Sequence, residues 1–167
     1  VGGFSIACWA PLTPYVKARL GIDDAQLGLM ILFLGIGSVI AMPLAGALTS
    51  RIGCRAVFLT GTLLAVLSLP VLAFAGSLAV LAAGLFVFGL AMGAIDVAAN
   101  THGVEVQKAV GRPILSNFHA FYSIGGLSGA GGSALLLTLG FTPLATTLVA
   151  SGVMAVAMML IAPRMLS

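Results

Sequence analysis

Long apolar stretches separated by short polar segments make up most of this sequence. Crossing the roughly 30 Å hydrocarbon core of a bilayer as a helix takes about 20 residues at ~1.5 Å of rise each, and six stretches meet or nearly meet that length. They cover residues 1–16, 26–48, 56–75, 78–99, 114–139 and 142–162. We therefore predict an all-α membrane protein with six transmembrane helices.

Other arrangements of apolar sequence fit this pattern less well. Buried strands of a parallel sheet run for about 4 to 8 residues between turns, and these stretches are much longer. A transmembrane β-barrel would show alternating polarity in segments of about ten residues, which this sequence lacks. Helices are thus the expected element in every stretch.

The composition supports the membrane assignment. The chain has 167 residues, of which 60% are hydrophobic and 7% are charged, whereas soluble domains carry about 25% charged residues. So few charges cannot cover a water-exposed surface, and the bilayer is the expected surrounding. The net charge of +3 comes from basic residues scattered over short loops, so it does not indicate a nucleic-acid partner.

The two cysteines, Cys8 and Cys54, fall at different expected depths in the membrane, so no disulfide is predicted. Metal-ligand spacing and a phosphate-binding glycine loop are both missing from the sequence, and we expect no metal and no cofactor. The first residue is not a methionine and the first stretch has no charged leader. We therefore expect a chain shortened at its N-terminus, without a signal peptide.

The distribution of basic residues predicts an orientation. With the N-terminus in the cytoplasm, the inner loops hold five basic residues and the outer loops hold two, in agreement with the positive-inside rule. The inner set is Arg51, Arg55, Lys108, Arg112 and Arg164, and the outer set is Lys17 and Arg19. Because six is an even number of crossings, both termini are expected in the cytoplasm.

Asp96 is the one acidic residue well inside an apolar stretch. A carboxylate there costs roughly 2.5 to 3.5 kcal/mol, so it requires a partner or a wet cavity. Helical spacing puts a small and polar set on its face: Gly89, Gly93, Asp96 and Asn100. Asp96 is therefore a candidate for binding a proton or a polar solute. The alternative is a hydrogen-bonded cluster of Asp96, Asn100 and His119 that fixes the hairpin.

The fifth stretch carries a similar face. Its small and polar residues are His119, Tyr122, Gly126, Gly129 and Ser133. We expect stretches four and five to be antiparallel neighbours, with the GxxxG pairs Gly89–Gly93 and Gly125–Gly129 facing one another, because such pairs let helices approach closely in lipid. His119 and Tyr122 are candidate lining residues, although packing is the simpler role for His119. Asn100 and His102 lie near the expected interface, where solvation alone would explain them.

The loop between stretches two and three has a distinctive spacing: Gly46, Ser50, Arg51, Gly53 and Arg55. It resembles the loop signature of the major facilitator superfamily, in which a glycine is followed by an acidic residue, a basic residue, a second glycine and further basic residues. Ser50 replaces the acidic residue, and Cys54 stands where a basic one is common. The resemblance implies a part in switching between inward- and outward-facing states. An ordinary positive-inside loop is the alternative.

A further stretch is similar to the fucose-permease-like branch of that superfamily. It runs from Gly93-Ala-Ile-Asp96 through Asn100, Val104-Glu105 and Gly111-Arg112-Pro113 to Phe118-His119. In that branch an acidic residue of the fourth helix is associated with proton coupling. The resemblance thus implies that Asp96 is the coupling carboxylate, with Asn100 and His119 as polar lining.

The resemblance covers the whole chain but only six of the twelve helices of such transporters. It implies the N-terminal half, built from two inverted three-helix repeats, with the solute held between two halves. We expect the protein to continue beyond Ser167 into a second half, or the chain to dimerise. The expected function is secondary active transport of a small polar solute, such as a sugar, by proton symport with alternating access in a bacterial inner membrane.

Two other classes of protein are alternatives to a transporter. An intramembrane enzyme is suggested by Gly126-Leu-Ser128-Gly129, which resembles the GxSG element of rhomboid proteases, but no histidine follows on the sixth stretch. Serine chemistry needs a base within hydrogen-bond reach, so we do not expect an enzyme. A six-helix channel or a receptor without transport activity is the other alternative; a single aspartate is slight support for a channel filter.

Overall fold

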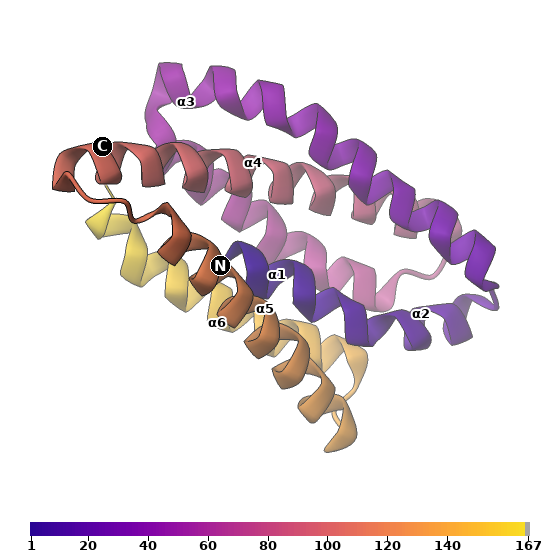
Figure 1. Ribbon diagram of the computed structural model, residues 1–167. Helices are drawn as coiled ribbons and strands as arrows, with labels where there is room; N and C mark the ends of the chain where they lie inside the picture. Colours follow the sequence, from indigo (N-terminus) through magenta and orange to yellow (C-terminus); the bar gives the residue numbers. More distant parts are fainter. Residues whose placement is uncertain (166–167) are drawn as a thin grey trace.

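Proline and glycine decide where the helices of this chain bend and end. The computed structural model describes residues 1–165, and its regular structure there is entirely helical (Figure 1). The elements are α1 (Gly2–Trp9), η1 (Ala10–Leu12), α2 (Thr13–Leu20), α3 (Asp24–Phe74), α4 (Leu78–Val110), α5 (Leu115–Thr138), α6 (Pro143–Ile161) and η2 (Ala162–Arg164). The expected all-α class is confirmed.

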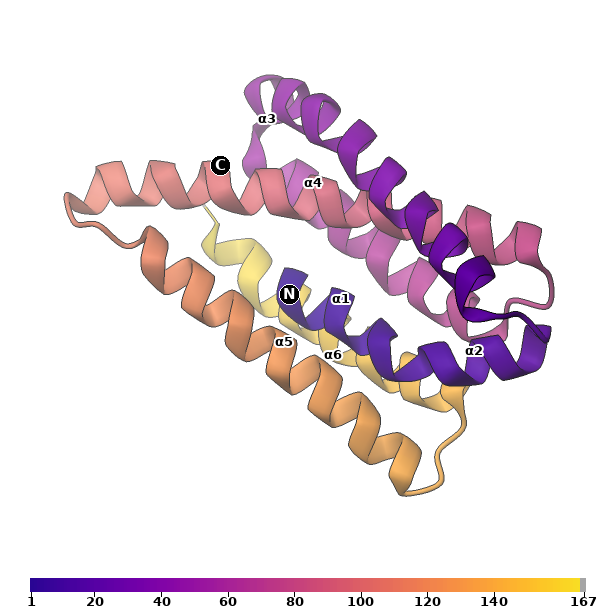
Figure 2. The same ribbon diagram turned by 45° about the vertical axis from the view of Figure 1, so that its right-hand side comes forward.

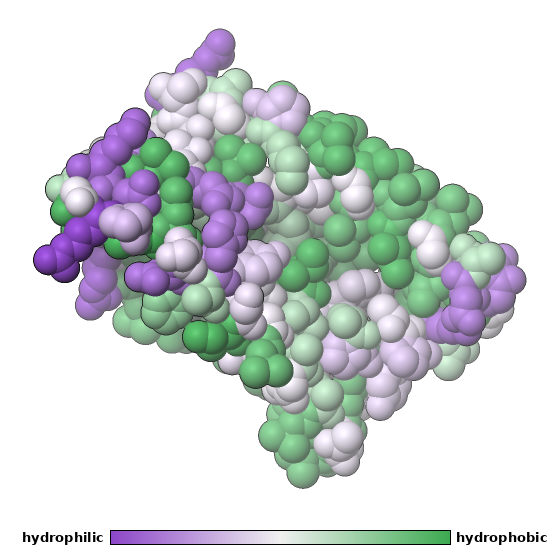
Figure 3. All heavy atoms as spheres, viewed as in Figure 1, coloured by the Kyte–Doolittle hydropathy of each residue, from purple (hydrophilic) through white to green (hydrophobic). Residues whose placement is uncertain are grey.

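Four helical segments of the described residues are long and apolar enough to cross a membrane: α3, α4, α5 and Pro143–Arg164. Figure 3 shows hydrophobic residues over the middle of the molecule and hydrophilic residues gathered at its two ends. Such a band suits a bilayer core with polar groups at both interfaces. The membrane assignment made from composition is therefore confirmed.

The first helical segment, from Gly2 to Leu20, is interrupted rather than continuous. Pro11 lies in the 3-10 turn η1, and Pro14 lies in the first turn of α2. Proline lacks the backbone N–H that a continuing α-helix uses, but it fits a first turn because N–H groups there have no partner in the helix. The two prolines therefore coincide with the interruption of the helix at η1.

Gly53 bends α3 into two arms, residues 24–52 and 54–74, which we call the first and second arms. Its backbone has φ 84° and ψ 154°, outside the helical region and accessible mainly to glycine. Figures 1 and 2 show the ribbon reversing direction at this point, so that the arms run back past one another. The second glycine of the loop pattern therefore makes the turn.

Helix α4 packs against both arms of α3, in the most extensive contact of the bundle. A Cβ atom added to Gly89 would lie 2.1 Å from the carbonyl oxygen of Leu34, and one on Gly93 would lie 2.5 Å from that of Ser38. No real Cβ fits at such distances. The glycines of α4 therefore hold its backbone directly against the first arm.

Helix α5 makes the equivalent contact with α1. A Cβ atom on Gly129 would lie 2.4 Å from the Phe4 carbonyl oxygen, and one on Gly125 would lie 3.3 Å from the Phe4 nitrogen. The expectation that Gly89–Gly93 and Gly125–Gly129 face one another is therefore wrong. Each glycine face is already filled by the backbone of another helix, and α4 and α5 touch one another little.

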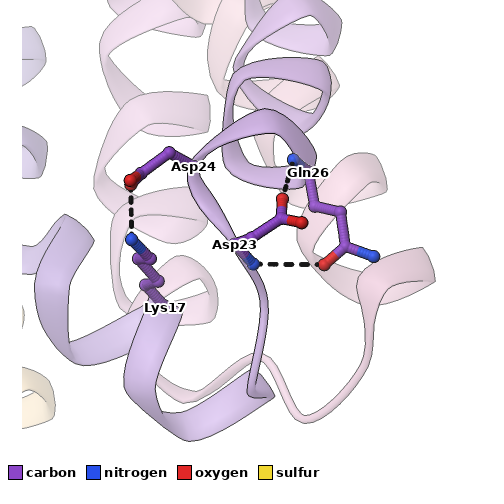
Figure 4. Close-up of polar contacts among 4 residues, drawn as sticks. All are labelled: Lys17, Asp23, Asp24 and Gln26. Carbon is purple, nitrogen blue, oxygen red and sulfur yellow. Dashed lines mark hydrogen bonds and ion pairs between the residues drawn. The ribbon is translucent and has the colours of Figure 1, made fainter.

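Hydrogen bonds and an ion pair stabilise the turn between α2 and α3 (Figure 4). The Asp23 carboxylate accepts from the Gln26 backbone N–H at 2.7 Å, and the Gln26 side chain accepts from the Asp23 N–H at 3.2 Å, which forms a capping box. Lys17 pairs with Asp24 at 2.5 Å, but Asp24 is 88% exposed, so this pair contributes little stability. The capping box therefore fixes the start of α3.

Arg19 connects the same end of the bundle to the end of α3. Its guanidinium donates to the carbonyl oxygens of Leu72, Ala73 and Ala75. The last carbonyls of a helix have no partner within it, and a cation there also offsets the helix dipole. One side chain therefore caps the second arm and holds it against α2.

We predict that Gly89→Ala destabilises the protein, because the new methyl group would meet the Leu34 carbonyl and force α4 away from the first arm. The expected loss is about 1 to 3 kcal/mol, the usual cost of overpacking. Thermal unfolding in detergent measures it. Gly152→Ala on α6 is the matched control, since nothing lies within 4 Å of that position; equal melting temperatures for both variants would contradict the prediction.

Candidate functional site

A cavity of about 600 Å³ lies where α1, α4, α5 and α6 approach one another. Asp96 reaches it from α4 and Tyr122 from α5, and Asn117, Phe118 and Phe121 continue the α5 wall. The lining thus combines aromatic rings with a carboxylate and an amide. Such a site suits a polar solute that also has an apolar face.

Asp96 is the acidic residue of this cavity. Within residues 1–165, no hydrogen bond or ion pair involves its carboxylate, and its backbone carbonyl accepts from the Asn100 side chain at 2.9 Å. A carboxylate without a protein partner is free to take a proton or to accept hydrogen bonds from a solute. The Asn100 side chain therefore bonds the backbone of Asp96 and leaves its carboxylate without a partner among the described residues.

Close backbone packing positions Tyr122. A Cβ atom on Gly3 would lie 2.1 Å from the Tyr122 carbonyl oxygen, so α1 and α5 touch at this point, and the ring packs beside Gly2. Tyr122 remains 47% exposed, toward the cavity it lines. The structure therefore brings Asp96 and Tyr122, both candidates from the sequence, to the same cavity from different helices.

His119 does not line the cavity with Asp96 and Tyr122. It is exposed on α5 and is absent from the residues that line the cavity, and its carbonyl accepts from the Ser123 hydroxyl at 3.2 Å. The lining stripe of α5 is formed by residues 117, 118, 121 and 122. At ~100° per residue, His119 lies roughly 130° around the helix from the centre of that stripe. The cluster of Asp96, Asn100 and His119 considered from the sequence is therefore not formed.

His102 was expected near the interface, where solvation alone would explain it. In the structure its side chain is only 13% exposed and lines the same cavity as Asp96, so it is largely shielded from solvent. The signal available in the sequence was the spacing of three that joins Asp96, Ala99 and His102 on α4, all of which line the cavity. Arg164, from η2, also lines this part of the cavity.

The residues of the loop pattern lie at the bend of α3. The Ser50 hydroxyl donates to the Ala47 carbonyl at 2.8 Å, so it bonds within its own helix. No other helix comes within 4 Å of a Cβ on Gly46, and Arg51 is exposed while Arg55 is half-buried. Within the described part of the chain, neither arginine forms an ion pair.

Cys54 joins the bend to α4. The thiol is buried, and its sulfur lies 3.8 Å from a carboxylate oxygen of Glu105. Burial and then the nearby Glu105 charge raise the pKa of Cys54, because both disfavour the thiolate. Within residues 1–165 no cluster of three or more His, Cys, Asp or Glu side chains could hold a metal ion.

The GxSG element is accounted for by local helix structure. The Ser128 hydroxyl donates to the Ile124 carbonyl at 2.8 Å, one turn earlier on α5. A nucleophilic serine would instead hydrogen-bond a base, which the described structure does not place beside it. Ser128 therefore has the ordinary role of a hydroxyl within a transmembrane helix.

Comparison with known proteins places the chain among membrane transporters. The family described as Major Facilitator Superfamily matches residues 1–166. An uncharacterized MFS-type transporter of Yersinia pestis is 48% identical over 98% of the chain, and an uncharacterized transporter of Sinorhizobium fredii is 35% identical over 79% of it. The chain spans 42% of the first relative and 35% of the second.

The fold is also that of a solved transporter. The crystal structure of the nucleoside transporter NupG matches 99% of the chain with a TM-score of 0.75, and the match covers 42% of that protein. The two sequences are 17% identical, so this likeness shows a shared fold. Relatives and fold are those of transporters, and the expectation that the chain is not an enzyme is confirmed.

We predict slow alkylation of Cys54 near neutral pH, because its raised pKa keeps the thiol protonated there and the thiolate is the reactive form. The rate should rise only above the pH range of a free cysteine. Glu105→Gln removes a negative charge, lowers the pKa and should speed alkylation at pH 8 about threefold. Maleimide labelling of the Cys54 peptide, followed by mass spectrometry, measures the rate.

Asp24→Asn is the matched control for this measurement, since Asp24 lies at the opposite end of the bundle and pairs with Lys17. It should leave the labelling rate unchanged. A Glu105→Gln rate equal to that of the unmodified protein would show that the carboxylate does not control the thiol.

Proposed function

Because this chain belongs to the major facilitator superfamily, we propose that it forms one half of a secondary active transporter that moves a small polar solute by proton symport. The observation that carries the proposal is Asp96, a carboxylate without a protein partner that faces a cavity between apolar helices. A carboxyl group that faces such a cavity and alternates between charged and neutral forms couples proton binding to the conformational change of the transporter.

Six membrane crossings follow if α3 crosses twice, once with each arm, and Gly2–Leu20 crosses once. The contacts support two inverted three-helix repeats of this set. In such repeats the first crossing corresponds to the fourth, and the second to the fifth. Gly89 of crossing four (α4) contacts Leu34 of crossing two (the first arm of α3). Gly129 of crossing five (α5) contacts Phe4 of crossing one (α1). The repeat relates these two helix pairs to one another.

The second half of the cavity is proposed to come from the rest of the transporter. The chain spans 42% of its Yersinia pestis relative, which leaves room for a further set of helices of similar size. We propose that this chain is the N-terminal half, with both termini in the cytoplasm of a bacterial inner membrane, and that the solute binds between the halves. A second copy of the chain is the other source of a partner half.

A sugar or a similar polar solute suits the lining best. Phe118, Phe121 and Tyr122 offer aromatic faces on which a ring can lie, and Asp96 and Asn117 offer polar groups at its edge. This combination agrees with the resemblance to the fucose-permease-like branch. The nucleoside named for NupG also contains a sugar ring, and nucleosides therefore belong in the panel of solutes to be tested.

The bend at Gly53 is proposed to act when the transporter changes between inward- and outward-facing states. Gly53 gives the backbone a sharp turn, and Arg51 and Arg55 on either side of it are free of ion pairs within residues 1–165. Charged groups without a fixed partner can pair differently in two states. Glu105 supplies a carboxylate beside this bend, because it contacts Cys54, the residue after Gly53.

We predict that Asp96→Asn abolishes coupling. In proteoliposomes that contain the full-length protein, a sugar or nucleoside that is transported should drive protons inward, and Asp96→Asn should reduce that proton flux at least about tenfold, because the amide cannot bind and release a proton. Exchange of labelled for unlabelled solute at equal pH should continue. A pH-sensitive dye inside the vesicles records the flux.

Asp24→Asn provides the control, since Asp24 is an exposed aspartate far from the cavity. Two results would count against the proposal. Solute entry without proton movement in the unmodified protein would exclude symport, and normal coupling in Asp96→Asn would leave Asp96 with a structural role only.

A further inference from the structure

His102 lies on α4 between the cavity and Glu105, which is one helical turn nearer the end of the helix. Its side chain is 13% exposed and lines the same cavity as Asp96. Its Nδ1 atom is buried and makes no hydrogen bond within the described residues. A buried ring nitrogen without a partner is unusual, because leaving such a group unpaired is costly.

The group that faces this nitrogen is Glu105. One of its carboxylate oxygens lies 3.8 Å from His102 Nδ1, one helical turn further along α4. The Glu105 side chain is 52% exposed, so it also reaches solvent at the end of the bundle that carries the bend of α3. Glu105 therefore lies between the buried imidazole and the outside.

The distance from Asp96 to His102 is within the span of a short water chain. The two residues are six positions apart on α4, or roughly 9 Å along the axis at ~1.5 Å per residue. Both line the cavity of about 600 Å³. At ~30 Å³ per water molecule, a cavity of this size holds on the order of twenty waters, which is ample for a chain between the two side chains.

Other charged or titratable groups surround this path. Arg164 of η2 and Tyr122 of α5 line the cavity, and Cys54 of α3 contacts the other carboxylate oxygen of Glu105 at 3.8 Å. Arginine does not release a proton in proteins, and tyrosine and cysteine are protonated near neutral pH in the absence of a strong perturbation. The side chains that lie along the path and can both accept and donate a proton are Asp96, His102 and Glu105.

We propose that His102 relays protons between Asp96 in the cavity and Glu105 at the end of α4. This inference rests on the proposed symport and adds the route by which the proton leaves. The Asp96 carboxyl releases its proton to cavity water, and the water chain delivers a proton to one ring nitrogen of His102. The other ring nitrogen gives its proton to the Glu105 carboxylate, which passes it to solvent. One proton has then moved and no net charge remains on the imidazole.

The relay is tested with the full-length protein in proteoliposomes by two measurements on each variant. Solute-driven proton flux requires the route, whereas exchange of labelled for unlabelled solute at equal pH does not. For His102→Gln we expect the flux to fall at least about tenfold while exchange stays within about twofold of the unmodified protein. Added imidazole, a small diffusible base, should restore part of the lost flux.

Glu105→Gln is the second variant, at a position exposed enough to tolerate the change, and it should lower the flux several-fold at unchanged exchange. His119→Gln is the matched control, because His119 is the other histidine of the chain and does not line the cavity. It should leave both measurements unchanged.

The outcomes separate the relay from the symport on which it rests. If the unmodified protein couples protons to solute and His102→Gln couples them equally well, the relay is wrong and the symport stands. If His102→Gln loses exchange together with flux, and imidazole restores neither, His102 has a structural role and the relay is also wrong. If the unmodified protein moves solute without protons, the symport fails first, whatever the variants do.

Discussion

Direct contact between helix backbones at glycine is the interaction on which this bundle depends. In lipid there is little hydrophobic driving force between helices, so their association relies on close packing and on satisfied polar groups. Gly89 and Gly93 hold α4 against the first arm of α3, and Gly129 holds α5 against α1. These contacts leave α4 and α5 apart along much of their length, and the cavity lined by Asp96 and Tyr122 lies between them. The packing of glycine faces elsewhere thus leaves this cavity open.

Helix α4 carries an aspartate, a histidine and a glutamate at successive positions along its length. Asp96 lies in the apolar part of α4, His102 lies lower on the same wall, and Glu105 reaches solvent near the bend at Gly53. Polar groups in a membrane are costly, and a row of them along one helix is therefore notable. Cys54 connects this row to the bend of α3. A movement of the bend would accordingly shift Cys54 and change its contact with Glu105.

Errors in the site prediction have a common cause. The spacing of residues gives the face of a helix but not the partner of that face. His119 and Tyr122 were assigned to one polar face, yet the turn of α5 directs Tyr122 to the cavity and His119 away from it. His102 lies just beyond the fourth apolar stretch, which favours a solvated side chain, but α4 continues to Val110 and the His102 side chain is only 13% exposed. Both cases required the packing of a second helix to decide them.

The sequence by itself determined the helical class, the membrane environment and the resemblance to a transporter family, and it singled out the loop pattern around Gly53 and Asp96 as a candidate site residue. These follow from local properties: apolar length, glycine conformation and the cost of an intramembrane charge. Tertiary structure alone decided which helices meet at Gly89 and Gly129, which residues line the cavity, and that His102 faces Glu105. Those facts depend on helix rotation and on contacts between distant residues, which hydrophobic spacing along one stretch does not encode.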